Sequence, residues 1–596
     1  MIRREQALAS LSADPFDVVV VGGGITGAGV ALDAASRGYS VALVERADYA
    51  SGTSSRSSKL IHGGLRYLQN FDLGLVREAL LERSLMVELA PHLVRPLPLV
   101  VSSFEGDRPD RLMGVGLNLY DVMAVERLRS PRGRRARTRA RSTTAESPAG
   151  MPNEDGRDRG RRRRGVTARA GRRTRPDARA ESWSPERHRM ISGEEVVELL
   201  PALSDRHPTG GYLFYDCQTD DARLVLTVLG EAERFGAVCA NRLEVTELIE
   251  QGGRAAGVRA RDGETGETIE IRADNVINAT GVWADRLRPA ELHDEAEVPN
   301  IRPSRGTHIT LRPDDVPLVG GAIVPAGGSR TVFALPWLNR TLIGTTDNDY
   351  SGELEHIHPS AEDVEYLLDA VNSFFGTTLD TGQIAGAFAG VRPLIATGDP
   401  RKSVDISRKA ELYETSSGMI TITGGKLTTW RRMAKSAVDR LVEREARDAP
   451  CRTHEIPLGQ AIDADELERV EGVPEPSYAA LAARYGYAAV EVLEIAASRG
   501  ELAQPIVEDL PDLLAEVVQA ARREQARTVG DVLLRRTRLG LLAARALRDS
   551  GDGPVARVAA ALGSELGWDP ARVTGEAQRF AEEARAEGIV VEDRAP

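Results

Sequence analysis

The feature that most constrains this chain is a glycine-rich turn close to its N-terminus. An apolar run at residues 17–21 is followed by Gly22, Gly24 and Gly27, a helical stretch, and a second apolar run at residues 40–44 that ends at Glu45. Glycine triplets also occur in ordinary turns, but strand, turn, helix, strand and acid within about 30 residues are typical of a dinucleotide-binding βαβ unit. Gly22 would allow the tight turn, Gly24 a close approach to pyrophosphate and Gly27 close helix packing, while Glu45 would bond a ribose hydroxyl.

The length and cysteine content suit a multidomain intracellular protein. With 596 residues the chain is long enough for two or more domains with their own cores. No apolar run approaches the 18 or so residues that span a bilayer, and residues 1–15 lack the apolar core of a signal peptide. The spacing of Cys217, Cys239 and Cys451 fits neither a disulfide framework nor a metal site, so we expect buried, inert thiols and no bound metal.

The charge is distributed unevenly along the chain. The net charge is −12, yet residues 127–189 carry 21 arginines and 7 acids. Residues 128–183 are nearly free of aliphatic side chains and are predicted to be a disordered, solvated insertion or a wrongly framed stretch. A nucleic-acid patch is the alternative, but interleaved aromatics are missing, so we expect no nucleic-acid partner. Elsewhere acids are abundant and the chain has five lysines, which favours a halophilic, salt-adapted source.

The order of patterns predicts an α/β fold with three parts. Residues 242–279 alternate as short strands that return to the main sheet, further strands are expected within residues 301–346, and residues 419–423 form a strand that stops at Gly424. Helical spacing begins near residue 450, for instance at residues 513–521 and 529–547. We therefore predict a Rossmann-like domain (1–90, 205–300 and 385–445), an antiparallel substrate or cap domain (91–204 and 301–384) and an all-α C-terminal domain (450–596).

Seven separated motifs resemble one family, the FAD-dependent glycerol-3-phosphate dehydrogenases of the respiratory type. They occur in family order and together with the βαβ unit and the helical tail they cover most of the chain. The motifs are SSKLIHGGLRYL at 57–68, DDARL at 220–224, NATG at 278–281, GTH at 306–308, GTTD at 344–347, GVRPL at 390–394 and GGKLTT at 424–429.

The resemblance implies a flavoenzyme that oxidises sn-glycerol 3-phosphate to dihydroxyacetone phosphate, with hydride transfer to FAD. It implies catalytic roles for His308, Arg392 and Lys426, and substrate binding by Arg66, Tyr67, Arg392, Arg408 and Lys426. The FAD-binding residues expected are Gly22, Gly24, Gly27, Glu45, Ser57, Ser58, Leu60, Gly281, Gly425, Leu427 and Thr428.

The residues themselves agree with that chemistry. Gly425 and Lys426 stand where a strand gives way to a helix, so free N–H groups and the positive helix end can stabilise negative charge at the flavin. Cations in glycine-bearing turns suit a phosphate, because a forked guanidinium can hold it in two hydrogen bonds. His308 has the ordinary pKa of a group able to take a hydroxyl proton, although a hydrogen-bonded core histidine is the plain alternative.

Other partners follow from the resemblance or stay open. The family's acceptor is membrane quinone, so we expect electrons to pass to quinone or a partner subunit, and a cytoplasmic protein attached peripherally to the cytoplasmic face of the membrane. Only Cys451 follows residue 435, so no iron–sulfur relay is expected. A homo-oligomer is compatible with the sequence. Two alternative functions remain: a related FAD-dependent amine or amino-acid oxidoreductase, which would need a carboxylate clamp, and a non-enzymatic nucleic-acid or scaffold protein.

Overall fold

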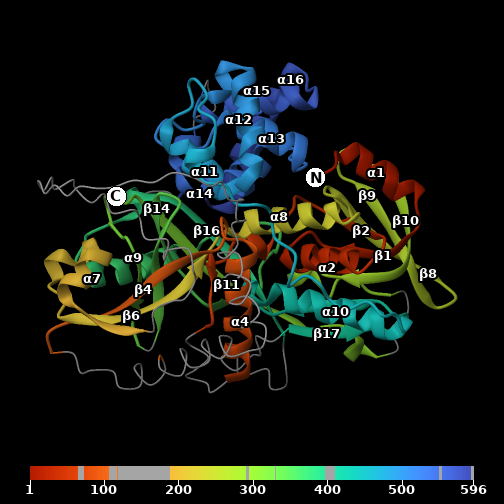
Figure 1. The fold of residues 1–596 in the computed structure, drawn as a ribbon, viewed down its shortest axis with the longest axis horizontal. Coiled ribbons are helices and arrows are strands. Elements are labelled where there is room, and N and C mark those ends of the chain that lie inside the picture. The colour runs from red at the N-terminus through yellow and green to blue at the C-terminus, as the bar shows by residue number, and fades with distance from the viewer. Residues whose placement is uncertain are drawn as a thin grey trace, which may run out of the picture.

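The computed structural model describes residues 1–64, 73–106, 117, 188–289, 294–328, 330–395, 410–548 and 553–591. Within these ranges two sheets lie side by side and a layer of helices from the C-terminal part of the chain covers one end of both (Figure 1). The predicted fold class is confirmed. The Arg-rich stretch predicted at residues 128–183, and the candidate residues Arg66, Tyr67 and Arg408, lie outside the described residues.

The first sheet is built on the predicted βαβ unit. Its order is β17 (Ala410–Glu414), β18 (Ile420–Gly424), β10 (Thr268–Asn278), β1 (Phe16–Val21), β2 (Val41–Val44) and β7 (Val238–Ala240). All neighbours are parallel except β17, which runs antiparallel to β18. The carboxyl ends of the parallel strands therefore meet at one edge, where α/β sheets hold their ligands.

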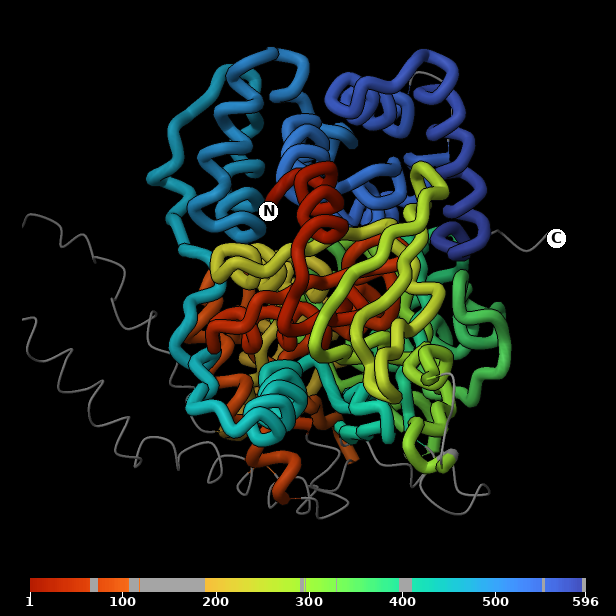
Figure 2. Tube along the Cα trace, turned by 90° about the vertical axis from the view of Figure 1, so that its right-hand side faces the viewer, coloured from red at the N-terminus to blue at the C-terminus, as the bar shows by residue number. Residues whose placement is uncertain are grey.

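Alternation along β1 places its valines in two different cores. Val18 and Val20 pack with α2 (Ile25–Ser36), α8 (Asp221–Arg234) and α10 (Trp430–Glu445). Val19 and Val21 pack on the opposite face with α1 (Arg4–Ala13) and with β8 (Leu243–Gln251) and β9 (Arg254–Asp262). A strand buried on both faces is expected to be apolar, as this one is from Val18 to Val21. Strands β8, β9 and β10 pair antiparallel, which confirms the predicted insert that returns to the main sheet (Figure 2).

The second sheet is mostly antiparallel and has ten strands within the part of the chain that the structure describes. α7 (Gly193–Leu199) and α9 (Ala361–Phe375) share a core with one of its faces, and α4 (Leu73–Leu89) precedes its first long strand. The strands are β3 (Leu60–Ile61), β4 (Arg95–Ser103), β5 (Arg189–Ser192), β6 (Gly210–Gln218), β11 (Ile301–Leu311), β12 (Gly321–Pro325), β13 (Thr331–Trp337), β14 (Arg340–Gly344), β15 (Asn348–Asp349) and β16 (Ile384–Ile395).

Pairing in this sheet differs from the predicted domain ranges. Residues 205–300 and 385–445 were assigned to the Rossmann-like domain, whereas β6 pairs with β4 and β16 pairs with β11 in the second sheet. The chain crosses between the sheets at the ends of these strands. Strand composition does not reveal which partner a strand pairs with, so the crossing points could not be placed from the sequence.

The C-terminal part is helical, as predicted. It contains α11 (Glu475–Tyr485), α12 (Ala489–Ser498), α13 (Leu514–Arg523), α14 (Leu539–Leu542), α15 (Pro554–Leu566) and α16 (Pro570–Glu587). The periodic run at residues 529–547 is not one helix: a π-helical turn at Asp531–Arg536 ends before Arg538, which has a φ of 65°. A left-handed residue breaks the helix, and the fully buried Arg538 side chain reaches Asp221 at the start of α8.

Among the described residues, none of the helices combines the length and the apolar character that crossing a bilayer requires.

Candidate active site

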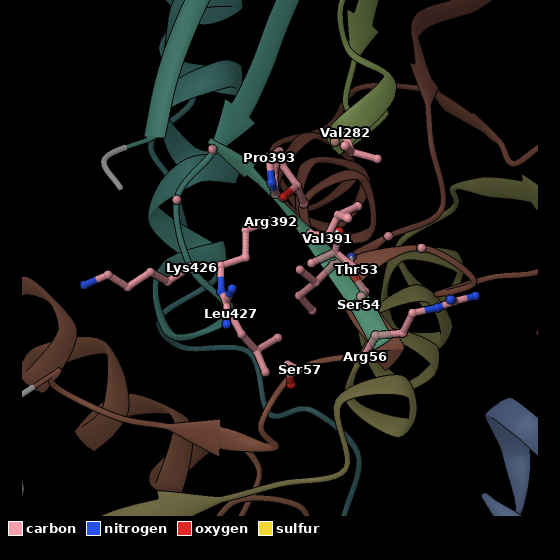
Figure 3. Close-up of a pocket in the computed structure, with 18 of the residues that line it drawn as sticks. Thr53, Ser54, Arg56, Ser57, Val282, Val391, Arg392, Pro393, Lys426 and Leu427 are labelled. Atoms are coloured by element: carbon pink, nitrogen blue, oxygen red, sulfur yellow. Dashed lines mark hydrogen bonds between the residues drawn. The ribbon is translucent and has the colours of Figure 1, made fainter. Parts of the chain in front are cut away.

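A cavity of about 640 Å³ opens between the two sheets. It begins at the first glycine turn and extends to strands β11 and β16 of the second sheet. Figure 3 shows three segments around it: residues 53–57, residues 391–393 of β16, and the turn at residues 426–427. Segments that are far apart in the sequence thus converge on one space.

The glycine turn at one end leaves no room for side chains. Gly22 has a φ of 113°, and a Cβ on it would lie 2.7 Å from the carbonyl oxygen of Ala279. A Cβ on Gly27 would lie 1.9 Å from the carbonyl oxygen of Gly22, so Gly27 packs beneath the turn while Gly22 and Gly24 line the cavity. The tight turn at Gly22 and the close packing at Gly27 are the features that the dinucleotide interpretation predicts for these two glycines.

Glu45 lies at the end of β2 beside this turn. Its carboxylate accepts hydrogen bonds from the backbone N–H of Gly23, at 2.7 Å, and of Ala47, at 2.9 Å. Burial raises the pKa of Glu45, and the two N–H donors oppose that effect. The side chain is therefore held rigidly at the cavity wall, where a ribose hydroxyl could reach it.

These residues fit FAD. The cavity runs from the N-terminus of α2, through the glycine cradle and Glu45, to a second glycine turn after β18. Of the predicted cofactor-binding set, all except Gly27 line the cavity: Gly22, Gly24, Glu45, Ser57, Ser58, Leu60, Gly281, Gly425, Leu427 and Thr428.

His308 and Arg392 lie on the same face of the second sheet. Arg392 on β16 is directly opposite Ser304 on β11, and His308 follows four residues later on β11. Every second side chain of a strand points to the same face of the sheet, so His308 and Arg392 share one face. Their Cα atoms are roughly 14 Å apart along the strand direction. Gly306 between them makes room for the guanidinium, because a Cβ there would lie 2.7 Å from an Arg392 nitrogen.

His308 is buried, with 2% of its surface exposed. Its ring stacks on Phe388 at 4.7 Å between centroids, and its Nε2 is 2.9 Å from the Ser58 hydroxyl. Burial, and then the positive charges of Lys59 and Arg392, hold the pKa of His308 well below its ordinary value. The imidazole is therefore neutral at physiological pH and can accept a proton.

Arg392 already has anionic and polar neighbours. Its guanidinium forms an ion pair with Asp347 at 3.1 Å and donates to the hydroxyl of Thr345 at 3.2 Å. The Arg392 side chain keeps 28% of its surface exposed, and that of Asp347 keeps 38%. An exposed pair of this kind is weak, so an incoming anion can displace the carboxylate at small cost.

Lys426 approaches the cavity from the turn after β18. It lines the same space as Arg392, although Figure 3 shows its side chain directed away from that of Arg392. Thr428, two residues on, exchanges hydrogen bonds of 3.1 Å with the backbone of His62. The turn is thereby tied to the segment that carries the other predicted FAD contacts.

The sequence assigned no role to several residues that organise the site. Asp221 accepts hydrogen bonds from the hydroxyl of Ser57 at 2.7 Å and from Lys59 Nζ at 2.8 Å. Asp347 and Thr345 hold Arg392. All four lie in the recognised motifs, but the pairing of a buried lysine with a carboxylate 162 positions away has no local signal.

Comparison with known proteins agrees with this geometry. The family described as FAD dependent oxidoreductase matches residues 17–431, and the family described as C-terminal domain of alpha-glycerophosphate oxidase matches residues 451–573. Glycerol-3-phosphate dehydrogenase 2 of Mycobacterium tuberculosis is 34% identical over 605 residues, with 100% of this chain and 92% of that protein covered. The aerobic glycerol-3-phosphate dehydrogenase of Bacillus subtilis is 32% identical, with 90% and 89% covered.

A solved structure extends the likeness to the whole fold. The glycerol-3-phosphate dehydrogenase of Bacillus halodurans, crystallised with FAD, superposes with a TM-score of 0.72 at 26% identity, and the match covers 99% of each chain. The resemblance predicted from the seven motifs is confirmed. This chain belongs to the family of FAD-dependent glycerol-3-phosphate dehydrogenases.

Proposed function

We propose that this protein oxidises sn-glycerol 3-phosphate to dihydroxyacetone phosphate with FAD as its cofactor. The observation that carries the proposal is the placement of His308 and Arg392 on one face of paired strands, at the end of a cavity that starts at the glycine turn. A base and a guanidinium at this spacing can address the two ends of a small phosphorylated alcohol. The relatives' names supply the same substrate class.

The glycine cradle, Glu45 and the second glycine turn would hold the cofactor. Gly22, Gly24 and the N-terminus of α2 face the pyrophosphate, and Glu45 accepts from the ribose. Gly425 and Leu427 offer backbone N–H groups at the flavin end, with Ser57, Ser58, Leu60, Gly281 and Thr428 along the remaining wall. Bound FAD supplies the hydride acceptor for the reaction.

His308 would remove the proton from the C2 hydroxyl as hydride leaves C2. The low pKa of its buried ring keeps it neutral before the reaction. The Ser58 hydroxyl at 2.9 Å fixes the orientation of the ring, and the stacked Phe388 prevents it from tilting. This leaves a base with a defined position relative to the cavity.

Arg392 would bind the phosphate, with Lys426 as a second cation on the cavity wall. A guanidinium can donate two parallel hydrogen bonds to phosphate, and the nearby Asp347 keeps the fork oriented until the substrate arrives. By resemblance Arg66, Tyr67 and Arg408 would join this group. Holding the phosphate fixes C2 over the cofactor, and alignment of this kind can lower a barrier by about 7–11 kcal/mol.

Product analysis tests the proposal. The purified holoprotein, with an artificial dye as electron acceptor, should form dihydroxyacetone phosphate in a one-to-one ratio with dye reduced. Glycine, proline and glycerol at the same concentration should give little dye reduction. Reduction of the dye by an amino acid and not by glycerol 3-phosphate would instead establish an amino-acid oxidoreductase.

We also propose that electrons leave for quinone or a partner subunit at the cytoplasmic face of a membrane. The support is the family resemblance, and attachment would be peripheral. Co-sedimentation with anionic vesicles and reduction of a soluble quinone analogue test this. A protein that stays in solution and does not reduce the quinone would contradict it.

A salt-adapted source is proposed from the composition. Outside residues 127–189 the chain carries a large acidic excess and few lysines, so self-repulsion should be strong at low ionic strength. The melting temperature should rise as KCl is raised from millimolar to molar concentration. A melting temperature that is insensitive to KCl would refute this proposal.

A further inference from the structure

Arg538 reaches from the C-terminal helices into the region beneath the cavity. It is fully buried, and its backbone conformation breaks the helical run. Its guanidinium donates to the carbonyl oxygen of Ser55 at 2.8 Å and to the Asp221 carboxylate at 3.0 Å. Burying an arginine and holding its backbone in a left-handed conformation both cost free energy, and these two hydrogen bonds offset part of that cost.

Asp221 joins Arg538 to the segment that carries Ser58. Its carboxylate accepts from the backbone N–H and the hydroxyl of Ser57, at 3.0 and 2.7 Å, and from Lys59 Nζ at 2.8 Å. Both neighbours of Ser58 are therefore tied to one carboxylate, and Arg538 holds that carboxylate from the other domain. The position of Ser58 is fixed from both sides.

Two contacts transmit this position to His308. The Ser58 hydroxyl lies 2.9 Å from His308 Nε2, and Lys59 Nζ lies 4.7 Å from the ring of Phe388, on which His308 stacks.

The same C-terminal segment also supports the strands. The carbonyl oxygen of Leu541 accepts a hydrogen bond from the hydroxyl of Thr310, which lies two residues after His308 on β11. It also packs so closely on Gly386 that a Cβ there would lie 2.4 Å away.

We propose that Arg538 is a positioning residue for the reaction, and that the C-terminal domain sets the orientation of His308 through Asp221 and residues 57–59. The inference rests on the proposed role of His308 as the base. The plain alternative is that Arg538 stabilises the domain interface and has no effect on the reaction itself.

Arg536 provides a matched control. It is also fully buried and lies in the same domain, but it pairs with Asp48 and Glu524, and none of the described contacts joins it to Asp221. Arg536→Gln should therefore disturb the domain interface at least as much as Arg538→Gln. Only Arg538→Gln should slow the reduction of bound FAD by glycerol 3-phosphate.

The experiment compares FAD-loaded variants by rapid mixing without oxygen. Arg538→Gln should reduce the rate of FAD reduction about 10- to 100-fold, the range expected for a misplaced catalytic group, with the Kd values for substrate and FAD changed less than threefold. Arg538→Lys should recover most of the rate. Arg536→Gln should lower the melting temperature and leave the rate unchanged.

A double-mutant cycle tests the route through Asp221. If Arg538 acts through Ser57, the Ser57→Ala change should slow reduction when Arg538 is intact or replaced by Lys, and it should add little in the Arg538→Gln background. Multiplicative effects, or a rate in Arg538→Gln equal to that of the parent protein, would overturn the inference. If Arg538→Gln does not yield holoprotein, Arg538→Met takes its place in the cycle. Failure of the proposed function would look different, because the unaltered protein would not be reduced by glycerol 3-phosphate at all.

Discussion

Replacing Arg392 by alanine should impair both substrate binding and turnover. The guanidinium stands over Gly306 on the same face as His308, where a substrate phosphate would be held. Two charge-assisted hydrogen bonds contribute about 1.5–3 kcal/mol each, or about 3–6 kcal/mol together. The side chain is 28% exposed, so water weakens these bonds and the lower half of the range applies. The ion pair with Asp347 offsets at most about 1 kcal/mol.

The expected loss in kcat/KM for glycerol 3-phosphate is therefore about 10²- to 10³-fold, since each 1.36 kcal/mol is a factor of ten. Part of it should fall on kcat, because binding energy from the phosphate is used to align C2. Steady-state assays with a dye acceptor measure both parameters. Turnover of glycerol, which has no phosphate, should be unchanged in the variant.

A neighbouring arginine gives the control. Arg302 lies on β11 on the same sheet, does not line the cavity, and pairs with Asp349 at the surface. Arg302→Ala should leave kcat/KM within a factor of two of the parent value. The reasoning is refuted if Arg392→Ala retains normal kcat and KM, or if glycerol and glycerol 3-phosphate lose activity equally.

Three other perturbations have defined outcomes. Because the pKa of His308 is depressed in the ligand-free site, the acid limb that His308 contributes to kcat/KM should lie well below pH 6.5. The unfolded chain binds that proton near pH 6.5, so the free energy of unfolding should fall as the pH drops below this value. An acid limb from the enzyme at or above pH 6.5 would contradict the assignment. Gly27→Val should abolish FAD retention after gel filtration, because its Cβ would collide with the Gly22 carbonyl, and a variant with full flavin content would contradict this. Asp48→Ala should lower the free energy of unfolding by about 3–5 kcal/mol in denaturant titrations, since it removes the buried carboxylate that Arg535 and Arg536 share; a loss below about 1 kcal/mol would show that the interface does not depend on these pairs.

The features that could be predicted from the sequence are those set by contacts between residues close together in the chain. The glycine turn could be interpreted because the positive φ of Gly22 and the contact of Gly27 with the Gly22 carbonyl both arise within one βαβ unit. The turn at Gly425 could be interpreted because a strand and a helix flank it. His308 and Arg392 were identified only through family motifs. Their common face depends on the register of β11 with β16, which no local pattern encodes.

The features that the sequence did not predict all depend on contacts between residues that are far apart in the chain. Asp221, Lys59 and Arg538 come from three segments, and their charges are compatible with ordinary surface residues until the fold buries them together. Residues 529–547 have helical spacing, but the structure interrupts the helix within them. The periodicity of the run contains no sign of the break at Arg538, because the contacts that stabilise the break are made by another domain.

The most direct test of the account is an anaerobic titration of the purified, yellow holoprotein. Addition of sn-glycerol 3-phosphate should bleach the flavin absorption to completion near one equivalent per site, while glycine or proline leaves it unchanged. A flavin that is not bleached by glycerol 3-phosphate, or a protein that purifies without flavin and cannot be reconstituted with FAD, would contradict the central claim.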